Sequence, residues 1–171
     1  MTAVPTGQGI TLTPHAFITQ WRNAPHKFQV SLWNFEVKMG KVAQEEFQKS
    51  FDIKRFNSNG STAWAARKRR KDEKKYHPLM YETGSLKNSI KWKHAGKQGD
   101  PNGVIVYTDP NGFTHTNRHK GFCYAAVHNG PDSYRTGSVK NMPRRQFMGY
   151  STEVKDDLIK SSIEIFKRLL I

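Results

Sequence analysis

The strongest pattern in the chain is a run of apolar residues at helical spacing in its first third. Its members follow one another at intervals of three to five residues: Phe28, Leu32, Phe35, Met39, Val42, Phe47 and Phe51. This spacing places the side chains on one face of an α-helix. Residues 57–60, Asn-Ser-Asn-Gly, then favour a turn. The pattern therefore predicts a long amphipathic helix that ends before this turn.

A shorter helical pattern precedes it. Thr13 is a suitable cap, and Pro14 suits the first position of a helix that would carry Phe17, Ile18 and Trp21. Asn-Ala-Pro at residues 23–25 predicts a break before the long helix. We therefore expect residues 1–24 to form an N-terminal extension with a short helix, and residues 25–171 to form a single domain.

A third helical pattern lies at the C-terminal side. Ser151 can cap a helix, Glu153 suits its first turn, and Lys167 suits its last. An apolar stripe follows this cap: Val154, Leu158, Ile165 and Leu169. The sequence therefore predicts a second amphipathic helix after residue 151.

Strand signals occupy the middle of the chain. Residues 103–108 are β-branched and aromatic, and Asp-Pro-Asn-Gly turn sequences flank them at 100–103 and 109–112. Residues 122–127 are a plausible partner strand, and residues 86–92 suit a helical turn running into a strand. The fold class predicted is α+β: a small antiparallel sheet packed by a long N-terminal helix and a C-terminal helix, with long mobile loops.

Charge narrows the range of functions. The chain has 171 residues, 28 Lys plus Arg against 14 Asp plus Glu, a net charge of +14 and one cysteine. The strong positive electrostatic field of a chain with this charge favours acidic partners: nucleic acid, a membrane surface or an acidic protein. Residues 61–97 carry eleven of the basic residues, centred on the run from Arg67 to Lys71. That run is either a solvated loop or a phosphate-contacting segment. No apolar run is long enough to span a membrane.

The chain contains only weak candidates for a catalytic or metal-binding pattern. His115, His119, Cys123 and His128 have a tempting spacing for zinc, but their segment reads as a loop, where this spacing does not align ligands. Two nuclease-like spacings also fail: His115 to His119 lacks the surrounding ββα pattern of a His-Asn-His site, and in the pattern of Asp132, Glu153 and Lys155 the last two begin a helix instead of lying on a strand. There is no P-loop and no dinucleotide fingerprint. We expect a binding or assembly protein with no catalytic residue, metal or cofactor.

Several strings along the chain resemble one family. They are Trp64 with the basic run, Leu79, Thr83-Gly84-Ser85-Leu86, Ser89-Ile90, Tyr124-Ala-Ala-Val-His128 with Gly130, and Met142 to Gly149 with Ser151. In this order they resemble the tail-completion, or virion-morphogenesis, proteins of tailed phages, of the Mu-like G-protein type. The resemblance covers roughly residues 28–171. Arg145 and Gln146 depart from it, because a single Arg and a Pro are more usual there.

The resemblance implies a structural subunit without catalytic activity, made in the bacterial host cytoplasm and built into the virion. It implies a ring, with six copies expected, at the neck or the tail top, which completes the tail and joins it to the DNA-filled head. Portal or connector and tail-tube proteins would be its partners, packaged DNA a further contact, and no membrane is involved. Neck and tail-terminator positions both stay open, as does a chain that is monomeric in solution.

Two sets of residues follow from this interpretation. Contacts with a neighbouring subunit or partner are expected at Trp64, Arg67, Arg69, Arg70, Arg144 and Arg145. Structural motif positions are expected at Thr83, Gly84, Leu86, Tyr124, His128, Phe147 and Gly149, with Phe147 in the core. Trp64 fills either a partner's pocket or its own core, and Arg144 either bridges an acidic group or is solvated.

The alternative function is a basic nucleic-acid-binding module. It rests on the charge and on the mixture of aromatic and basic residues around Trp64 and Trp92.

In the assembly interpretation, the basic run faces either packaged DNA or an acidic portal. We expect the loops at residues 64–76 and 129–141 to become ordered on docking.

Overall fold

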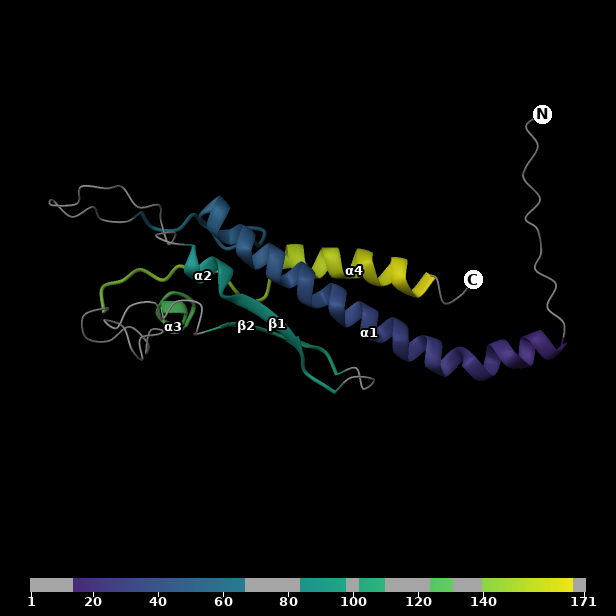
Figure 1. Cartoon of the computed structure of the whole chain (residues 1–171). Coiled ribbons are helices and arrows are strands. Elements are labelled where there is room, and N and C mark those ends of the chain that lie inside the picture. Colours follow the sequence, from purple (N-terminus) through teal and green to yellow (C-terminus); the bar gives the residue numbers. More distant parts are fainter. Residues whose placement is uncertain (1–13, 67–83, 98–101, 110–123, 131–139, 168–171) are drawn as a thin grey trace, which may run out of the picture.

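A computed structural model describes residues 14–66, 84–97, 102–109, 124–130 and 140–167. Figure 1 shows the elements in order: α1 (Pro14–Ile53), α2 (Ser85–Asn88), β1 (Ile90–His94), β2 (Val104–Thr108), α3 (Tyr124–Asn129) and α4 (Thr152–Lys167). The fold is α+β, which confirms the predicted class. None of the helices described is long and apolar enough to cross a membrane.

Helix α1 is a single helix of 40 residues, so the predicted break at residues 23–25 is wrong. Pro25 lies inside the helix. Proline removes one backbone hydrogen bond and its ring crowds the preceding turn, so a helix that continues through a proline is bent there. Figure 1 shows such a bend in the first, purple part of α1. The apolar spacing on both sides of Pro25 is therefore carried by one element.

The sheet is a two-stranded antiparallel hairpin of β1 and β2. Its register pairs Ile90 with Thr108, Trp92 with Val106 and His94 with Val104. The predicted helical turn and strand at residues 86–92 and the strand at 103–108 are thus confirmed. The strand predicted at residues 122–127 is wrong for the part that is described, because residues 124–129 form helix α3. Two alanines in this segment favour a helix.

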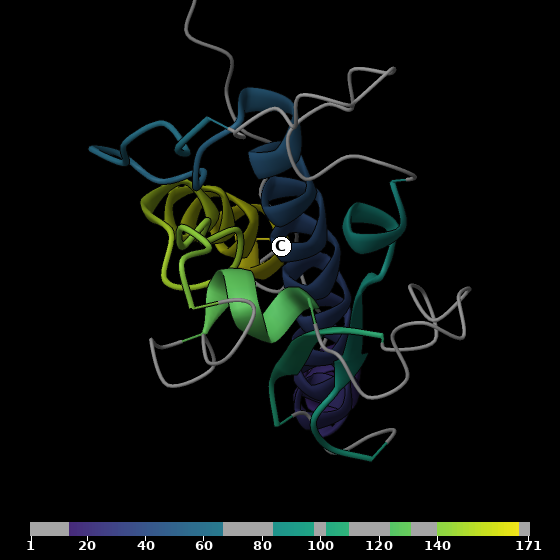
Figure 2. The same ribbon diagram turned by 90° about the vertical axis from the view of Figure 1, so that its left-hand side faces the viewer.

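Helix α1 lies between α4 on one side and the hairpin on the other. Figure 2 looks along α1 and shows α4 and the hairpin on different sides of it. The hairpin approaches closely at Gly40, where a Cβ would overlap the Trp92 indole. Helix α4 begins as predicted, because the Ser151 hydroxyl accepts a hydrogen bond from the Val154 backbone N–H at 3.3 Å.

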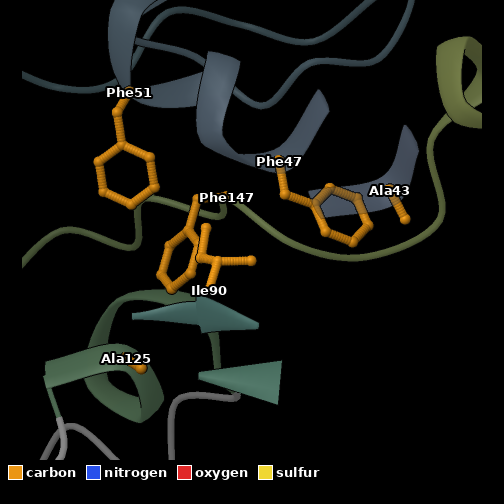
Figure 3. Packing of buried hydrophobic residues seen from close by; sticks show 6 residues of the cluster. All are labelled: Ala43, Phe47, Phe51, Ile90, Ala125 and Phe147. Atoms are coloured by element: carbon orange, nitrogen blue, oxygen red, sulfur yellow. The ribbon is translucent and has the colours of Figure 1, made fainter. Parts of the chain in front are cut away.

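The core forms where α1 meets the hairpin, α3 and the segment before α4. Its buried residues are Ala43, Phe47, Phe51, Ile90, Ala125 and Phe147. Figure 3 shows Phe147 reaching from the segment before α4 into the space between α1 and the strands. Phe147 and Ile90 are fully buried, and the Phe51 and Phe147 rings lie 5.1 Å apart. The prediction that Phe147 belongs to the core is confirmed.

Candidate functional site: the motif junction and the α1–α4 groove

Several of the motif residues meet at one place, here called the motif junction, formed by Trp64, His128, Asn129 and Arg145 to Phe147. Trp64 is half-buried, and its indole Nε1 donates a hydrogen bond to the Gln146 carbonyl at 2.9 Å. Its ring packs edge-on against Phe51 at 5.6 Å. The sequence left open whether Trp64 fills a partner's pocket or packs in its own domain, and in the structure it packs in its own domain.

Arg145 is the central residue of the junction. Its side chain is buried, and Nε and Nη2 both donate to the Ala65 carbonyl at 3.2 Å. Its backbone N–H donates to the carbonyl of buried His128 at 3.0 Å. Arg145 was expected at a surface contact, and the structure places it inside the domain. It fixes the chain two residues before Arg67, where the basic run begins.

Asn129 is a further residue of the junction, and sequence reasoning missed it. Its Oδ1 accepts hydrogen bonds from the backbone N–H groups of Phe147 and Met148, at 2.9 and 2.8 Å. The only available signal was an asparagine directly before Gly130, where a helix tends to end. Through this side chain, α3 positions the Phe147 segment against α1.

The glycines at the motif positions are structural. Gly84 precedes α2 with a φ of 71°, and its carbonyl accepts a hydrogen bond from the Asn88 N–H at 2.9 Å. Gly149 has a φ of 151°, and a Cβ there would overlap the Gln146 amide. Both conformations favour glycine. Leu86 is half-buried against the core.

The remaining predicted residues divide into two groups. Arg144 is exposed, and its Nη2 lies 3.5 Å from the Asn129 carbonyl. Tyr124 begins α3. Arg67, Arg69, Arg70 and Thr83 lie outside the described residues, and so do His115, His119 and Cys123. Within the described residues no three His, Cys, Asp or Glu side chains are grouped to hold a metal ion.

A buried acid on α1 forms a second polar cluster, at the other end of the hairpin. Glu36 Oε2 accepts a hydrogen bond from His94 Nδ1 at 2.8 Å, and Oε1 accepts one from the Gly103 N–H. The His94 ring stacks on Trp33, with centroids 3.6 Å apart. These contacts tie both strands to α1, and no nucleophile is part of them. Sequence reasoning missed this cluster, because Glu36 and His94 are 58 residues apart.

An apolar groove lies between α1 and the start of α4. It is open, has a volume of about 400 Å³, and contains the polar side chains of Lys155 and Ser162 among mainly apolar ones. The apolar residues of this α1–α4 groove are Phe35, Tyr150, Val154, Leu158 and Ile159. Tyr150 is 74% exposed at its edge, and Ile159 is 48% exposed. The groove thus exposes a small apolar surface beside the start of α4.

The pKa of Glu153, at the start of α4 beside the groove, is shifted. Desolvation raises the pKa of Glu153, but hydrogen bonds from the Thr152 hydroxyl, its own backbone, the Ser151 hydroxyl and Asn59 outweigh it. The net effect is a pKa below its ordinary value of 4.5. Glu153 is therefore ionised at neutral pH and places a negative charge at the N-terminus of α4, which is favourable.

No family model matches the sequence, and neither the curated proteins nor the solved structures give a match.

Proposed function

We propose that this chain is a structural subunit of a tailed phage or prophage. It assembles as a ring at the neck or the tail top, completes the tail and joins it to the DNA-filled head. The observation that carries the proposal is the motif junction: strings far apart in the sequence, whose order resembles the tail-completion family, supply side chains to one place. There the Trp64 indole donates a hydrogen bond to the carbonyl next to Arg145, and the Arg145 side chain donates one to the carbonyl next to Trp64. The Arg145 backbone N–H donates a third to the His128 carbonyl.

The role of the junction supports a subunit that binds partners through its loops. Arg145 fixes the chain at Ala65, and buried Gly84 opens α2 next to the core. The segment with the basic run lies between these two anchored points in the sequence. The positive charge of the run suits docking onto an acidic portal or onto packaged DNA.

The test is electron microscopy of an induced lysate in which the gene is interrupted. We expect DNA-filled heads beside separate tails for a joining protein, or overlong tails for a tail terminator. A plasmid copy of the wild-type gene should restore joined particles. Normal, infectious particles without the gene would overturn the proposal.

Changing Arg67, Arg69 and Arg70 to Glu separates the two partners of the basic run. Heads that join tails but lose their DNA would assign the run to DNA. Failure to join, with DNA retained, would assign it to the portal. The matched control is Lys38→Glu, Lys41→Glu and Arg55→Glu, which makes the same change in charge at exposed positions outside both the run and the hairpin.

A second candidate, nucleic-acid binding, is favoured by the outer face of the hairpin. Lys91 and Lys93 are exposed on β1, and the register places them opposite Tyr107 and Ile105. Lys93 Nζ lies 5.6 Å from the centre of the half-exposed Tyr107 ring. Trp64 and Trp92, in contrast, pack against their own domain.

A basic face with an accessible aromatic ring suits phosphate contact and base stacking. Binding of single-stranded DNA should then weaken steeply as salt rises, and Tyr107→Ala should weaken it at all salt concentrations. Binding that is insensitive to Tyr107→Ala, with Tyr150→Ala as the matched control, would exclude the hairpin face.

A further inference from the structure

The first part of α1 has no covering element in the described structure. Every residue from 22 to 30 is exposed, and so is Ile18. Figure 1 shows this purple part of α1 extending past the C-terminal end of α4. Contact between α1 and α4 begins at Phe28, because the centre of its ring lies 6.0 Å from that of Phe166 in the last turns of α4. Residues 14–27 are here called the arm.

The arm continues the face of α1 that packs on α4. Ile18, Pro25, Phe28, Leu32 and Phe35 follow at intervals of seven, three, four and three residues, which keeps them on one helix face. Phe35 of this face contacts Phe166, with ring centres 5.8 Å apart. Ile18 is 50% exposed and lies about 15 Å further along the helix than Phe28.

A free-standing helix of this length is marginal in water, because helices gain most of their stability from packing. The arm also contains a proline, which weakens it further. An amphipathic helix that extends beyond its domain is therefore the shape expected of an element that packs on another surface.

The charges select the surface that the arm fits. Between residues 14 and 30 the basic residues are Arg22 and Lys27, and there is no acid. Two arms would therefore repel each other. Helix α4 is different, because it carries four of the 14 acidic residues, Glu153, Asp156, Asp157 and Glu164, against three lysines. In a chain of net charge +14, this element has a net negative charge.

The same helix offers the matching apolar surface. Ile159 and Ile163 are half-exposed one turn apart on α4, and Ile159 also lines the α1–α4 groove. Exposed Asp156 and Glu164 lie next to them along the helix. Apolar residues and acids thus occur together on α4, as apolar residues and bases do on the arm.

We propose that the arm of one copy packs along α4 and the α1–α4 groove of a second copy. The contact is heterologous, because the two copies use different surfaces, and repetition of such a contact closes into a ring when the rotation allows it. This inference deepens the proposed function and rests on it, since it names the surfaces by which the subunits would associate.

The test uses the purified full-length chain and sedimentation velocity over a range of concentrations. The arm variant is Ile18→Asp and the groove variant is Ile159→Asp. Each should associate at least tenfold more weakly than the wild type, because burial of an isoleucine side chain is lost. Ile105→Asp is the matched control, since Ile105 is 45% exposed on β2 and lies outside the groove. It should associate as the wild type does.

Mixing the two variants gives the decisive result. An arm variant still has an intact groove, and a groove variant still has an intact arm, so an equimolar mixture should form a species of two copies. A mixture that stays monomeric would overturn the proposal, because a symmetric arm-to-arm contact gives no such rescue. A wild type that stays monomeric at about 1 mM would also overturn it.

Two further outcomes would also count against this contact. If Ile18→Asp lowers the melting temperature of the monomer and leaves association unchanged, the arm is covered by its own chain and the proposal fails. If plasmid copies carrying Ile18→Asp and Ile159→Asp each restore joined particles to a phage whose own gene is interrupted, the contact is wrong while the proposed function stands. Normal particles without the gene would overturn the function and leave the mixing result unaffected.

Discussion

Glu36 and His94 join the long helix to the hairpin, with Glu36 Oε2 2.8 Å from His94 Nδ1. The carboxylate is buried, and its other oxygen accepts the Gly103 N–H before β2. One side chain of α1 therefore holds both strands. A buried carboxylate is costly unless hydrogen bonds satisfy it, so the contact makes the position of the hairpin dependent on this residue.

Glu36→Gln should destabilise the fold. The amide keeps the shape of the carboxylate but replaces hydrogen bonds to a charged group by weaker ones, so we expect a loss of about 1–3 kcal/mol in the free energy of unfolding. Urea denaturation measures it. Glu45→Gln is the control, because Glu45 is exposed on the same helix. Equal stabilities of the two variants would contradict the role of Glu36.

Gly40→Ala should also destabilise, although alanine favours helices by up to about 1 kcal/mol over glycine. The added methyl would overlap the Trp92 indole, and overpacking costs about 1–3 kcal/mol. The measurements are thermal unfolding and the near-ultraviolet circular dichroism of tryptophan. The neighbouring exposed Lys41→Ala should change stability by less than about 0.5 kcal/mol. A stabilised Gly40→Ala would show that the hairpin does not lie on α1 there.

Arg145→Lys should loosen the motif junction, because lysine cannot place two donors on the Ala65 carbonyl in the geometry of Nε and Nη2. We expect a loss of about 1–3 kcal/mol in the free energy of unfolding. Amide exchange of Trp64, whose N–H donates to the Lys54 carbonyl at 2.8 Å, should be faster. Arg144→Lys is the control, since Arg144 is exposed. Equal exchange rates in the two variants would count against this role of Arg145.

Glu153 predicts a pH dependence. Its pKa is lowered in the folded state below 4.5, so the unfolded chain binds more protons at this residue in acid. Its contribution is complete above about pH 4.5 and is lost as pH falls through the lowered pKa. Glu153→Gln should flatten the fall in unfolding free energy over this range relative to the wild type, as measured by urea denaturation at a series of pH values. Curves of equal slope would contradict the prediction.

The sequence was most informative where one element buries one face. The apolar spacing of α1 and α4, the Ser151 cap and the β-branched run of β2 all depend on neighbours within a few residues. For this reason their positions, and the burial of Phe147, could be predicted without knowledge of the tertiary structure.

The features that sequence reasoning missed depend on distant partners. Pro25 does not end α1, because a bend accommodates its ring. Residues 124–129 form a helix, and β2 pairs with β1 instead of with this segment. Glu36 and His94 are 58 positions apart in the sequence, and Asn129 is 18 and 19 positions from its two partners. No local pattern in the sequence indicates these contacts.

The packing of Phe147 against α1 also bears on the order of folding. The hydroxyl of fully buried Ser50 lies 3.5 Å from the Phe147 carbonyl, across 97 residues of sequence. Contacts that close so long a loop form slowly, whereas a helix forms within about a microsecond. During synthesis, the part of α1 that packs on Phe147 therefore stays uncovered until residue 147 has left the ribosome, and uncovered apolar surface on a nascent chain is prone to aggregation.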